Sequence, residues 1–203
     1  MPPSFPTSLV VAAPAPAAGA YPLMDGGSGH GVDITELILT QHHEQRRTFA
    51  LLDELADDPA GLAAVWERLT ILLEVHAKAE EKFFYPRLLQ VGTGGGDTES
   101  AESETKDAIK DHNEIREAIR AVRRSTAGGK EWWRAVTEAN LANSDHMAEE
   151  ERQDLTDFRQ QTELELRHDI AVQFLRFEAD HWATGVKPVD KDPEEFVEQN
   201  ESS

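Results

Sequence analysis

The sequence predicts an all-α fold: an antiparallel four-helix bundle with an additional C-terminal helix and a disordered N-terminal segment. Three observations support this prediction. Apolar residues recur every three or four positions through four long segments, which is the period of a helix with one buried face. Short runs containing Pro or Gly separate these segments. The second pair of segments also repeats polar residues of the first pair at a constant offset along the chain, which indicates two similar helical hairpins.

The length and composition indicate one folded domain with extensions at both ends. The chain has 203 residues, of which 29% are charged and 39% hydrophobic, as expected of a single domain. We assign residues 1–32, rich in Pro, Ala and Gly, to a disordered segment, residues 33–160 to the bundle, and residues 161–203 to a C-terminal helix and tail.

The composition also excludes several classes of function. The net charge of −19 argues against nucleic acid as a partner, because binding its phosphates requires a basic face. There is no apolar run of about 18 residues, so we expect no membrane span. Without cysteine, disulfides, iron–sulfur clusters and thiol catalysis are excluded.

The N-terminal segment does not have the pattern of a signal peptide. Its apolar stretch, Leu9 to Ala20, is interrupted by prolines, and no Lys or Arg precedes it. We therefore expect a cytoplasmic location. Because the organised sequence begins only at Val32, Met24 is a candidate alternative start.

Capping residues place the first two helices. The first begins at Asp33, with Glu36 three residues later as in a capping box, and runs to about Ala56. The second begins at Asp58-Pro59, a cap followed by proline at the first helical position. It is expected to end or kink at Pro86, which lacks a backbone donor.

The later helices are placed mainly by glycine and by length. Residues 92–104 form a long connection, and the third helix covers about 105–125. The fourth starts near Lys130; because no Gly or Pro follows before Gly185, we expect a break near residues 160–165 and a fifth helix. The apolar side chains of this fifth helix cover either the outside of the bundle or a second subunit, which would make a homodimer.

Several large or titratable side chains outside the repeat are expected to serve packing. Trp132 and Trp133 lie near the start of the fourth helix, where they would close one end of the bundle. His168 and His181 belong to the fifth helix, and we interpret them as surface or packing residues.

Two H-x-x-x-E motifs indicate a metal site. His76 and Glu80 are four residues apart, as are His146 and Glu150. Four residues on a helix amount to one turn and about 40° of rotation, so each imidazole lies beside its carboxylate. A nitrogen donor beside an anionic oxygen donor provides half of a metal site.

The repeat supplies two further histidines. His42 precedes His76 by the same interval by which His112 precedes His146. This equal spacing selects His42 over its neighbour His43. All six residues fall on the apolar stripes of their helices, so four imidazoles and two carboxylates point inward, where unpaired charges cost several kcal/mol. A pair of metal ions would compensate them.

The donor set favours iron, with manganese next and zinc less favoured. Nitrogen and oxygen donors without sulfur suit all three metals, but six protein ligands are too many for one tetrahedral zinc. The economical arrangement has two ions bridged by Glu80 and Glu150. His42 and His76 would hold one ion, and His112 and His146 the other.

This pattern resembles the hemerythrin-like, or HHE cation-binding, family over about residues 33–160. The resemblance implies a hemerythrin-like bundle and a non-haem di-iron centre with an oxo or hydroxo bridge. Its ligands would be the six motif positions: His42, His76, Glu80, His112, His146 and Glu150.

The sequence departs from the oxygen-carrying hemerythrins, which have H-x-x-x-H on the third helix. Here the i+4 position is Arg116, and the last carboxylate is Glu at i+4 rather than Asp at i+5. This departure argues against simple reversible oxygen carriage. Tyr85, Glu81, Glu149 or a water would complete the coordination, although Tyr85 also suits packing at the end of the bundle.

Other polar residues of the repeat have two possible roles. Arg46 and Arg116 follow their histidines by one turn, and they either support the site by pairing with Glu81 or Glu151 or form plain surface ion pairs.

Three functions fit these features. The first is a di-iron protein that binds or senses O2, NO, peroxide or iron. The second is an enzyme with catalase- or peroxidase-like activity on hydrogen peroxide or nitric oxide. The third is a bundle in which the metal only stabilises the fold.

Overall fold

A computed structural model describes residues 31–95 and 100–201. From Gly31 onward the described chain forms one compact unit, and no strand occurs in it. Residues 1–30, which include Met24 and nearly all of the segment predicted to be disordered, lie outside the described residues.

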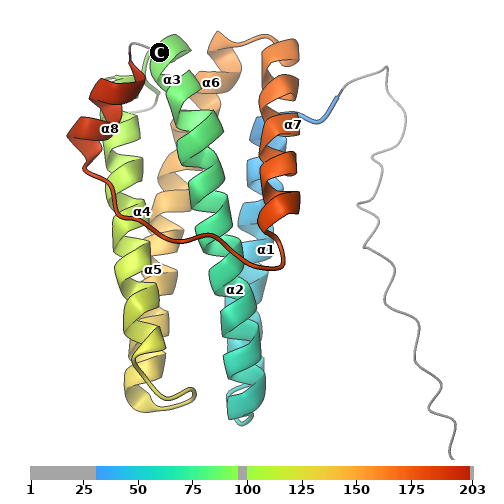
Figure 1. Ribbon diagram of the computed structural model, residues 1–203, viewed down its shortest axis with the longest axis vertical. Coiled ribbons are helices and arrows are strands. Elements are labelled where there is room, and N and C mark those ends of the chain that lie inside the picture. The colour runs from blue at the N-terminus through green and yellow to red at the C-terminus, as the bar shows by residue number, and fades with distance from the viewer. Residues whose placement is uncertain (1–30, 96–99, 202–203) are drawn as a thin grey trace, which may run out of the picture. The chain divides into compact units, whose positions relative to one another are not determined.

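The described residues form long helices and several short ones (Figure 1). The elements are α1 (Ile34–Glu54), α2 (Pro59–Ala79), the π-helical turn η1 (Glu80–Phe84), α3 (Tyr85–Val91), α4 (Ala101–Arg123), α5 (Lys130–Arg152), α6 (Asp154–Gln161), α7 (Leu164–His181) and α8 (Pro193–Asn200).

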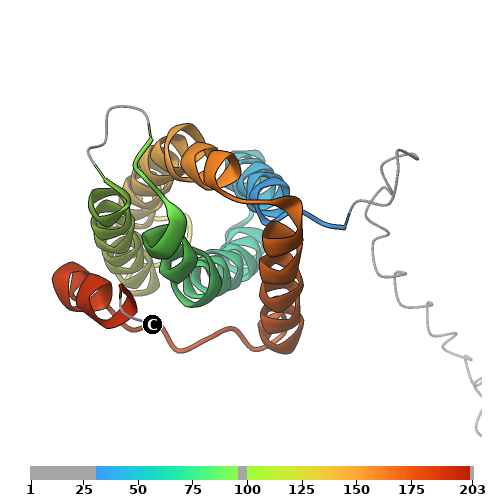
Figure 2. The ribbon, with the colours of Figure 1, turned by 90° about the horizontal axis from the view of Figure 1, so that it is seen from above.

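Helices α1, α2, α4 and α5 form the bundle and surround a common interior (Figure 2). Successive helices run in opposite directions, as the short connections require. Helix α7 packs outside the bundle against α1 and α2, and α8 packs against α4 and α3. The all-α bundle predicted from the sequence is therefore confirmed.

The starts of α1 and α2 agree with the sequence signals. The Asp33 side chain accepts a hydrogen bond from the Thr35 amide, and the Asp58 side chain accepts one from the Gly61 amide. The predicted start of the third bundle helix was wrong by one turn. Ser100 caps α4 by accepting from the Ser103 amide, so the helix begins at Ala101, and the preceding connection is correspondingly shorter.

Pro86 does not end the second helix, because a π-helical turn precedes it. Across η1, the Tyr85 amide donates to the Glu80 carbonyl five residues back. The chain then continues as α3 to Val91, with Pro86 in its first turn, where no donor is needed. The wider turn shifts the inward face by one residue. Phe84 and Tyr85 are therefore fully buried, whereas the neighbouring Phe83 is only partly buried.

The long helical segment after Lys130 breaks at two places. The predicted break appears at Thr162 and Glu163, between α6 and α7. A second break at Gln153, between α5 and α6, was not predicted. Gln153 follows the second H-x-x-x-E motif by three residues, and η1 begins within the first motif. Both hairpins therefore leave regular α-helix next to their H-x-x-x-E motifs.

A polar layer divides the core into two apolar clusters. One cluster includes Ile38, Phe84 and Phe158, and the other includes Leu52, Leu69 and Ile119. Trp132 is buried in the second cluster with its ring 6.0 Å from that of Trp66, as predicted for a packing residue. The layer between the clusters is made of buried polar side chains: His42, Gln45, His76, Glu80, His112, Arg116, Asn143, His146 and Glu150.

Helix α7 covers its own bundle. Ile170, Ala171 and Phe174 are buried in the first apolar cluster, so one of the two predicted alternatives for this apolar face is observed. His168 contacts the Val32 carbonyl and His181 contacts the Phe177 carbonyl, as expected of packing histidines. A homodimer stays a prediction. Among the described helices, none is both long and apolar enough to cross a bilayer.

Candidate metal centre

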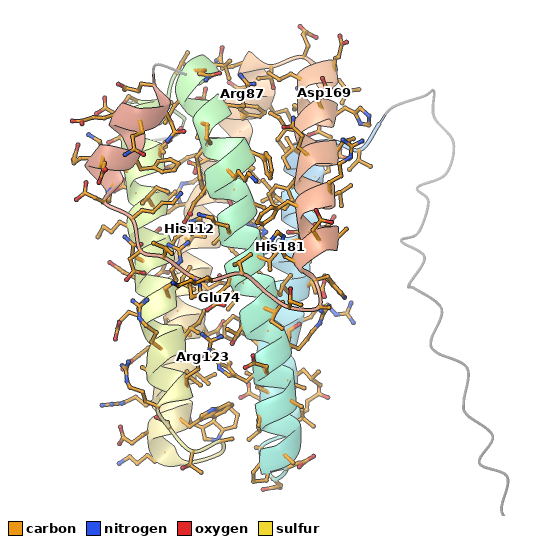
Figure 3. All side chains as sticks on the ribbon, in the orientation of Figure 1. Glu74, Arg87, His112, Arg123, Asp169 and His181 are labelled. Carbon is orange, nitrogen blue, oxygen red and sulfur yellow. The ribbon has the colours of Figure 1, made fainter. Side chains whose placement is uncertain are left out.

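The six predicted ligands converge in the polar layer. His112 projects from α4 toward the interior of the bundle (Figure 3). Each of the six side chains is at most 4% exposed. The bundle helices supply five of them, and η1 supplies Glu80. His43 is exposed, so the repeat identified the inward histidine of this pair.

Four of these residues form the first donor group. Ligand atoms of His42, His76, Glu80 and Glu150 all lie within 4.8 Å of one another. Nε2 of His76 is 2.8 Å from Oε1 of Glu80, and Nε2 of His42 is 3.1 Å from Oε2 of Glu150. Four donors this close could surround one metal ion.

The second donor group shares Glu80 with the first. It consists of Glu80, His112 and His146. Nε2 of His112 is 3.3 Å from Oε2 of Glu80 and 3.2 Å from Nε2 of His146. The two oxygens of Glu80 therefore face one histidine of each group, which is the position of a bridging carboxylate. Oε2 of Glu150 lies 3.1 Å from His42 and 4.0 Å from His146, also between the groups.

The outer nitrogen of each histidine contacts a polar side chain. This arrangement directs Nε2 of every ring toward the centre, because a partner at Nδ1 fixes the ring orientation. The contacts from Nδ1 are His42 to Glu151 at 2.9 Å, His112 to Glu81 at 3.2 Å, His76 to Gln41 at 2.6 Å, and His146 to Asp111 at 3.6 Å.

Two arginines hold the outer carboxylates in turn. Arg116 is buried and pairs with Glu81. Arg46 is partly exposed and pairs with Glu151 at 2.7 Å. Both arginines therefore pair with the carboxylates named in the first predicted alternative, Arg116 in the interior and Arg46 at a partly exposed position.

Burial and neighbouring charges shift the pKa values of two histidines and of Glu80 in this cluster. Burial lowers the pKa of His42, but its contacts with Glu150 and Glu151 outweigh burial and raise that pKa to about 9. The pKa of His112 is likewise about 9, because Glu80 and Glu81 outweigh burial. Burial raises the pKa of Glu80, but the histidines beside it hold that pKa well below its ordinary value. Protons on the imidazoles thus compensate the buried carboxylates.

The inward nitrogen and oxygen atoms are better suited to binding a metal than to hydrogen bonding with one another. Several of them are buried without a hydrogen-bond partner among the described residues, namely Nε2 of His42 and His76, both oxygens of Glu80, and Oε2 of Glu150. Buried polar atoms without a hydrogen-bond partner lower the stability of the fold, and these atoms lie close together. Divalent cations bound by the two donor groups would satisfy these atoms.

Three further candidates for coordination have different positions. The hydroxyl of Tyr85 is fully buried and donates to Oε1 of Glu150 at 2.9 Å. Glu81 contacts the outer nitrogen of His112 and so faces away from the inward atoms. Glu149 is exposed. Tyr85 is thus the one of the three that touches a carboxylate of the donor groups.

Sequence reasoning missed four residues that support the centre, namely Gln41, Asp111, Glu178 and Lys191. Gln41 contacts His76 and donates to Glu178 of α7 at 2.7 Å. Lys191, in the segment before α8, pairs with Glu81 at 2.9 Å. The repeat offered a signal for Gln41, since Asp111 occupies the equivalent position of the second hairpin, beside His146. Glu178 and Lys191 lie outside the repeat, and nothing in their spacing indicated them.

The comparison with known families agrees with this geometry. The family model of the hemerythrin HHE cation binding domain matches residues 33–156, a range that includes all four bundle helices and all six donors. The chain belongs to the hemerythrin HHE cation-binding family. None of the curated proteins and none of the solved structures matches the chain. The hemerythrin domain is a metal-binding domain, and the buried His/Glu groups of this one fit a metal site.

Proposed function

We propose that this hemerythrin-like protein holds two iron ions at a carboxylate-bridged centre, where it binds or senses O2, NO, peroxide or iron. The observation that carries the proposal is the pair of donor groups joined by Glu80. One carboxylate with an oxygen toward each group favours two adjacent ions rather than one. Two iron ions, with an oxo or hydroxo bridge as in the family, would supply redox electrons and coordination positions for a small ligand.

The distances support an assignment of ligands to the two ions. His42 and His76 would hold one ion, and His112 and His146 would hold the other. Glu80 would bridge, since its two oxygens face His76 and His112. Glu150 would be the second bridge.

The surrounding residues would orient the ligands and exclude water. The contacts at Nδ1 keep the imidazoles in the orientation in which Nε2 faces the centre. Tyr85 donates to Oε1 of Glu150 and leaves Oε2 facing the histidines. Burial and the nearby carboxylates raise the pKa of Tyr85 well above its ordinary value, so its hydroxyl keeps this proton. Phe174 of α7 packs against His76 with ring centres 6.0 Å apart.

The lack of a fifth histidine favours a small ligand at the second ion. Glu150 also lies nearer the first group, because its Oε2 is 3.1 Å from Nε2 of His42 and 4.0 Å from Nε2 of His146. Arg116 occupies the position of the additional histidine of oxygen-carrying hemerythrins, and its guanidinium is engaged with Glu81. Fewer protein ligands leave more positions for an added molecule on the His112 and His146 side.

The same open positions support an enzyme as the second candidate. A ligand site with spare positions would accept hydrogen peroxide or nitric oxide, and catalase- or peroxidase-like activity would follow from redox turnover. The two candidates differ in whether the small molecule is consumed.

Elemental analysis and a near-ultraviolet spectrum of the protein as isolated test the proposal. We expect about two iron ions per chain and an absorption band that changes when NO or peroxide is added. An iron content well below one per chain would refute the di-iron centre. Peroxide decay faster than that with the same concentration of free iron would favour the enzyme, and equal decay would exclude it.

A further inference from the structure

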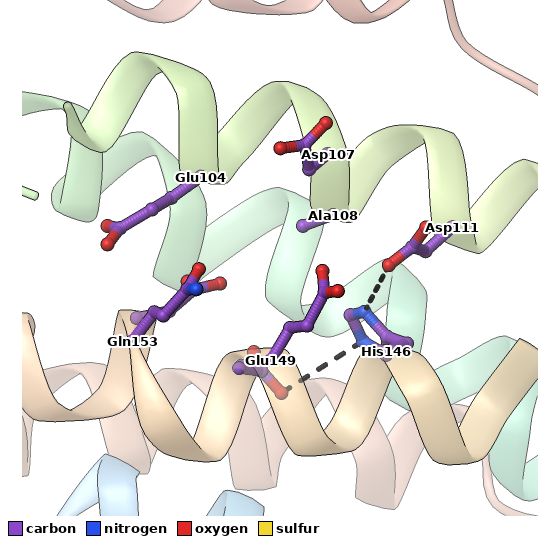
Figure 4. A pocket seen from close by; sticks show the side chains of 9 residues that line it. Glu104, Asp107, Ala108, Asp111, His146, Glu149 and Gln153 are labelled. Atoms are coloured by element: carbon purple, nitrogen blue, oxygen red, sulfur yellow. Dashed lines mark ion pairs between the residues drawn. The ribbon is translucent and has the colours of Figure 1, made fainter. Parts of the chain in front are cut away.

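A small acidic cavity lies between α4 and α5 beside the metal centre (Figure 4). Its volume is about 10 Å³, which is room for one water molecule or a single small ion. No Lys or Arg is among its lining residues. Six carboxylates line it: Glu104, Asp107, Asp111, Glu149, Glu150 and Asp154.

These carboxylates extend from the surface to the centre. Asp107 and Glu149 are exposed, and Asp111 is partly exposed. Glu104 and Asp154 are buried. At the inner end, the cavity is lined by His146 and Glu150, which belong to the two donor groups. The acidic lining thus leads from solvent to two metal-binding side chains.

Glu104 provides the observation that points to a ligand. Its side chain is 2% exposed and reaches from α4 into the space between the helices (Figure 4). Oε1 accepts a hydrogen bond from the Gly95 amide at 2.5 Å. Oε2 is buried and has no hydrogen-bond partner among the described residues. A buried carboxylate oxygen without a donor is costly, and a cation in the cavity would compensate it.

The electrostatics of the cavity agree with this interpretation. Burial, with a smaller contribution from Asp157, raises the pKa of Glu104 to about 7. Burial and the charges of Glu150 and Glu104 raise the pKa of Asp154 well above its ordinary value. For both carboxyls, burial is the larger cause of the raised pKa and neighbouring negative charge the smaller one, and a positive ion would stabilise their ionised forms.

The cavity contacts the centre through His146. Oδ2 of Asp111 is 3.6 Å from Nδ1 of this histidine, and Oε2 of Glu150 is 4.0 Å from its Nε2 (dashed lines in Figure 4). An ion held by the cavity carboxylates would therefore be within one side chain of the donor groups.

We propose that this cavity is a third cation site, which takes up a divalent cation from solution and passes it to His146 and Glu150. Its donors are carboxylate oxygens, which suit hard divalent ions such as Fe²⁺, Mn²⁺ and Mg²⁺. The proposal that the cavity binds a cation depends only on the cavity and its lining residues. The transfer of that cation rests on the proposed function, because it needs a metal centre to receive the ion.

Binding is tested with Mn²⁺ as the probe, followed by loss of the electron paramagnetic resonance signal of the free ion. Protein whose centre already holds iron should bind about one Mn²⁺. Glu104→Gln should weaken this binding roughly tenfold, since it removes a buried negative charge, while the amide oxygen still accepts from Gly95. Iron-loaded protein that binds no Mn²⁺, or a variant that binds it as tightly as wild type, would overturn the site.

Transfer is tested by the rate at which metal-free protein takes up Fe²⁺ without oxygen. The double variant Asp107→Asn/Glu149→Gln removes two charges at the mouth of the cavity. We expect uptake about tenfold slower, because a charged cleft raises the local cation concentration, and an unchanged final iron content. Equal uptake rates in variant and wild type would overturn the transfer.

A second double variant controls for net charge. Glu131→Gln/Glu138→Gln removes the same charge from exposed positions of α5 outside the cavity. Its uptake rate should match wild type, and slowing equal to that of the cavity variant would refute a local effect. If wild type retains no iron, the proposed function fails. Mn²⁺ binding by metal-free protein, and its loss in Glu104→Gln, then decides the cavity separately.

Discussion

The two hairpins place equivalent polar residues around the centre, but different segments of the chain cover the two sides. His42, Glu151 and Arg46 form one chain of contacts, and His112, Glu81 and Arg116 form the other. Each residue is related to its counterpart by the constant offset of the repeat, apart from the exchange of Glu81 and Glu151 between hairpins. These polar contacts therefore follow the repeat, whereas the segments that cover the two sides do not.

On the His76 side, α7 covers the centre. Phe174 packs on the His76 ring, and Glu178 accepts from Gln41, which contacts the same ring. Burial raises the pKa of Glu178 to about 7. Among the described residues, an apolar ring and a hydrogen-bonded pair therefore cover this side.

On the His146 side, the position equivalent to Gln41 is Asp111, which lines the acidic cavity. The segment before α8 closes the neighbouring outer surface, where Lys191 pairs with Glu81. Tyr85, which donates to Glu150, has Leu155 at the equivalent position. The repeat therefore provides two similar sets of donors, and the surrounding residues differ: an apolar ring and a hydrogen-bonded pair lie beside His76, and acidic side chains lie beside His146.

The largest expected effect comes from removing an inward histidine of either half. His76→Ala and His146→Ala should each at least halve the bound metal, because each removes a nitrogen donor from one group. Elemental analysis after equilibration with Fe²⁺ measures this. The control is His43→Ala, which changes the exposed neighbour of a ligand. Loss of metal on that control would contradict the assignment of His42.

A smaller effect should separate the two outer carboxylates. Glu81 contacts His112, Arg116 and Lys191 in the interior, whereas Glu151 is 29% exposed. Glu81→Gln should lower the free energy of unfolding by about 3 kcal/mol, as for a broken buried pair. Glu151→Gln should lower it by only about 1 kcal/mol, as for an exposed pair. Urea denaturation of both metal-free variants measures the difference. Equal losses of unfolding free energy would show that Glu81 and Glu151 stabilise the fold equally despite their different burial.

The last comparison concerns the pH dependence of the metal-free protein. The pKa of His42 and that of His112 are about 9 when folded, against about 6.5 in an unfolded chain. Their protonation stabilises the fold fully below pH 6.5, and this stabilisation is lost as the pH rises through 9.

The melting temperature of metal-free protein should therefore fall by several degrees between pH 6.5 and 9. Metal-loaded protein should change less over that range, because the ions replace the protons on the imidazoles. Thermal unfolding followed by circular dichroism compares the two forms. A metal-free melting temperature that rises with pH would contradict the shifted histidines.

The bundle and the convergence of the six donors could be predicted because their signals are local and periodic. His42, His112 and the two H-x-x-x-E motifs lie on apolar stripes, and a helix places such residues on one face. The register of α3 could not be predicted in this way, since η1 adds one residue to a turn and moves Phe84 inward in place of Phe83.

Helix starts were predictable where a capping side chain marks them, and the break at Thr162 and Glu163 was predictable from the length of the segment. Asp33 and Asp58 cap their helices as expected. Ser100 caps α4 from within a Gly- and Ser-containing connection, where the start is ambiguous. The break at Gln153 has neither Gly nor Pro to mark it, so local preference gave no sign of it.

The sequence by itself determined the helical bundle, its doubled hairpin and the inward set of four histidines and two glutamates. The physical reason is that helical periodicity and a fixed repeat specify which side chains share a face before any helix meets another. Only the tertiary structure decided what surrounds that set. Glu178 reaches Gln41 across 137 positions of the chain, and Lys191 reaches Glu81 from a segment outside the repeat. Contacts between residues so far apart in the sequence depend on how the helices pack together, and that packing produces no periodic pattern in the sequence.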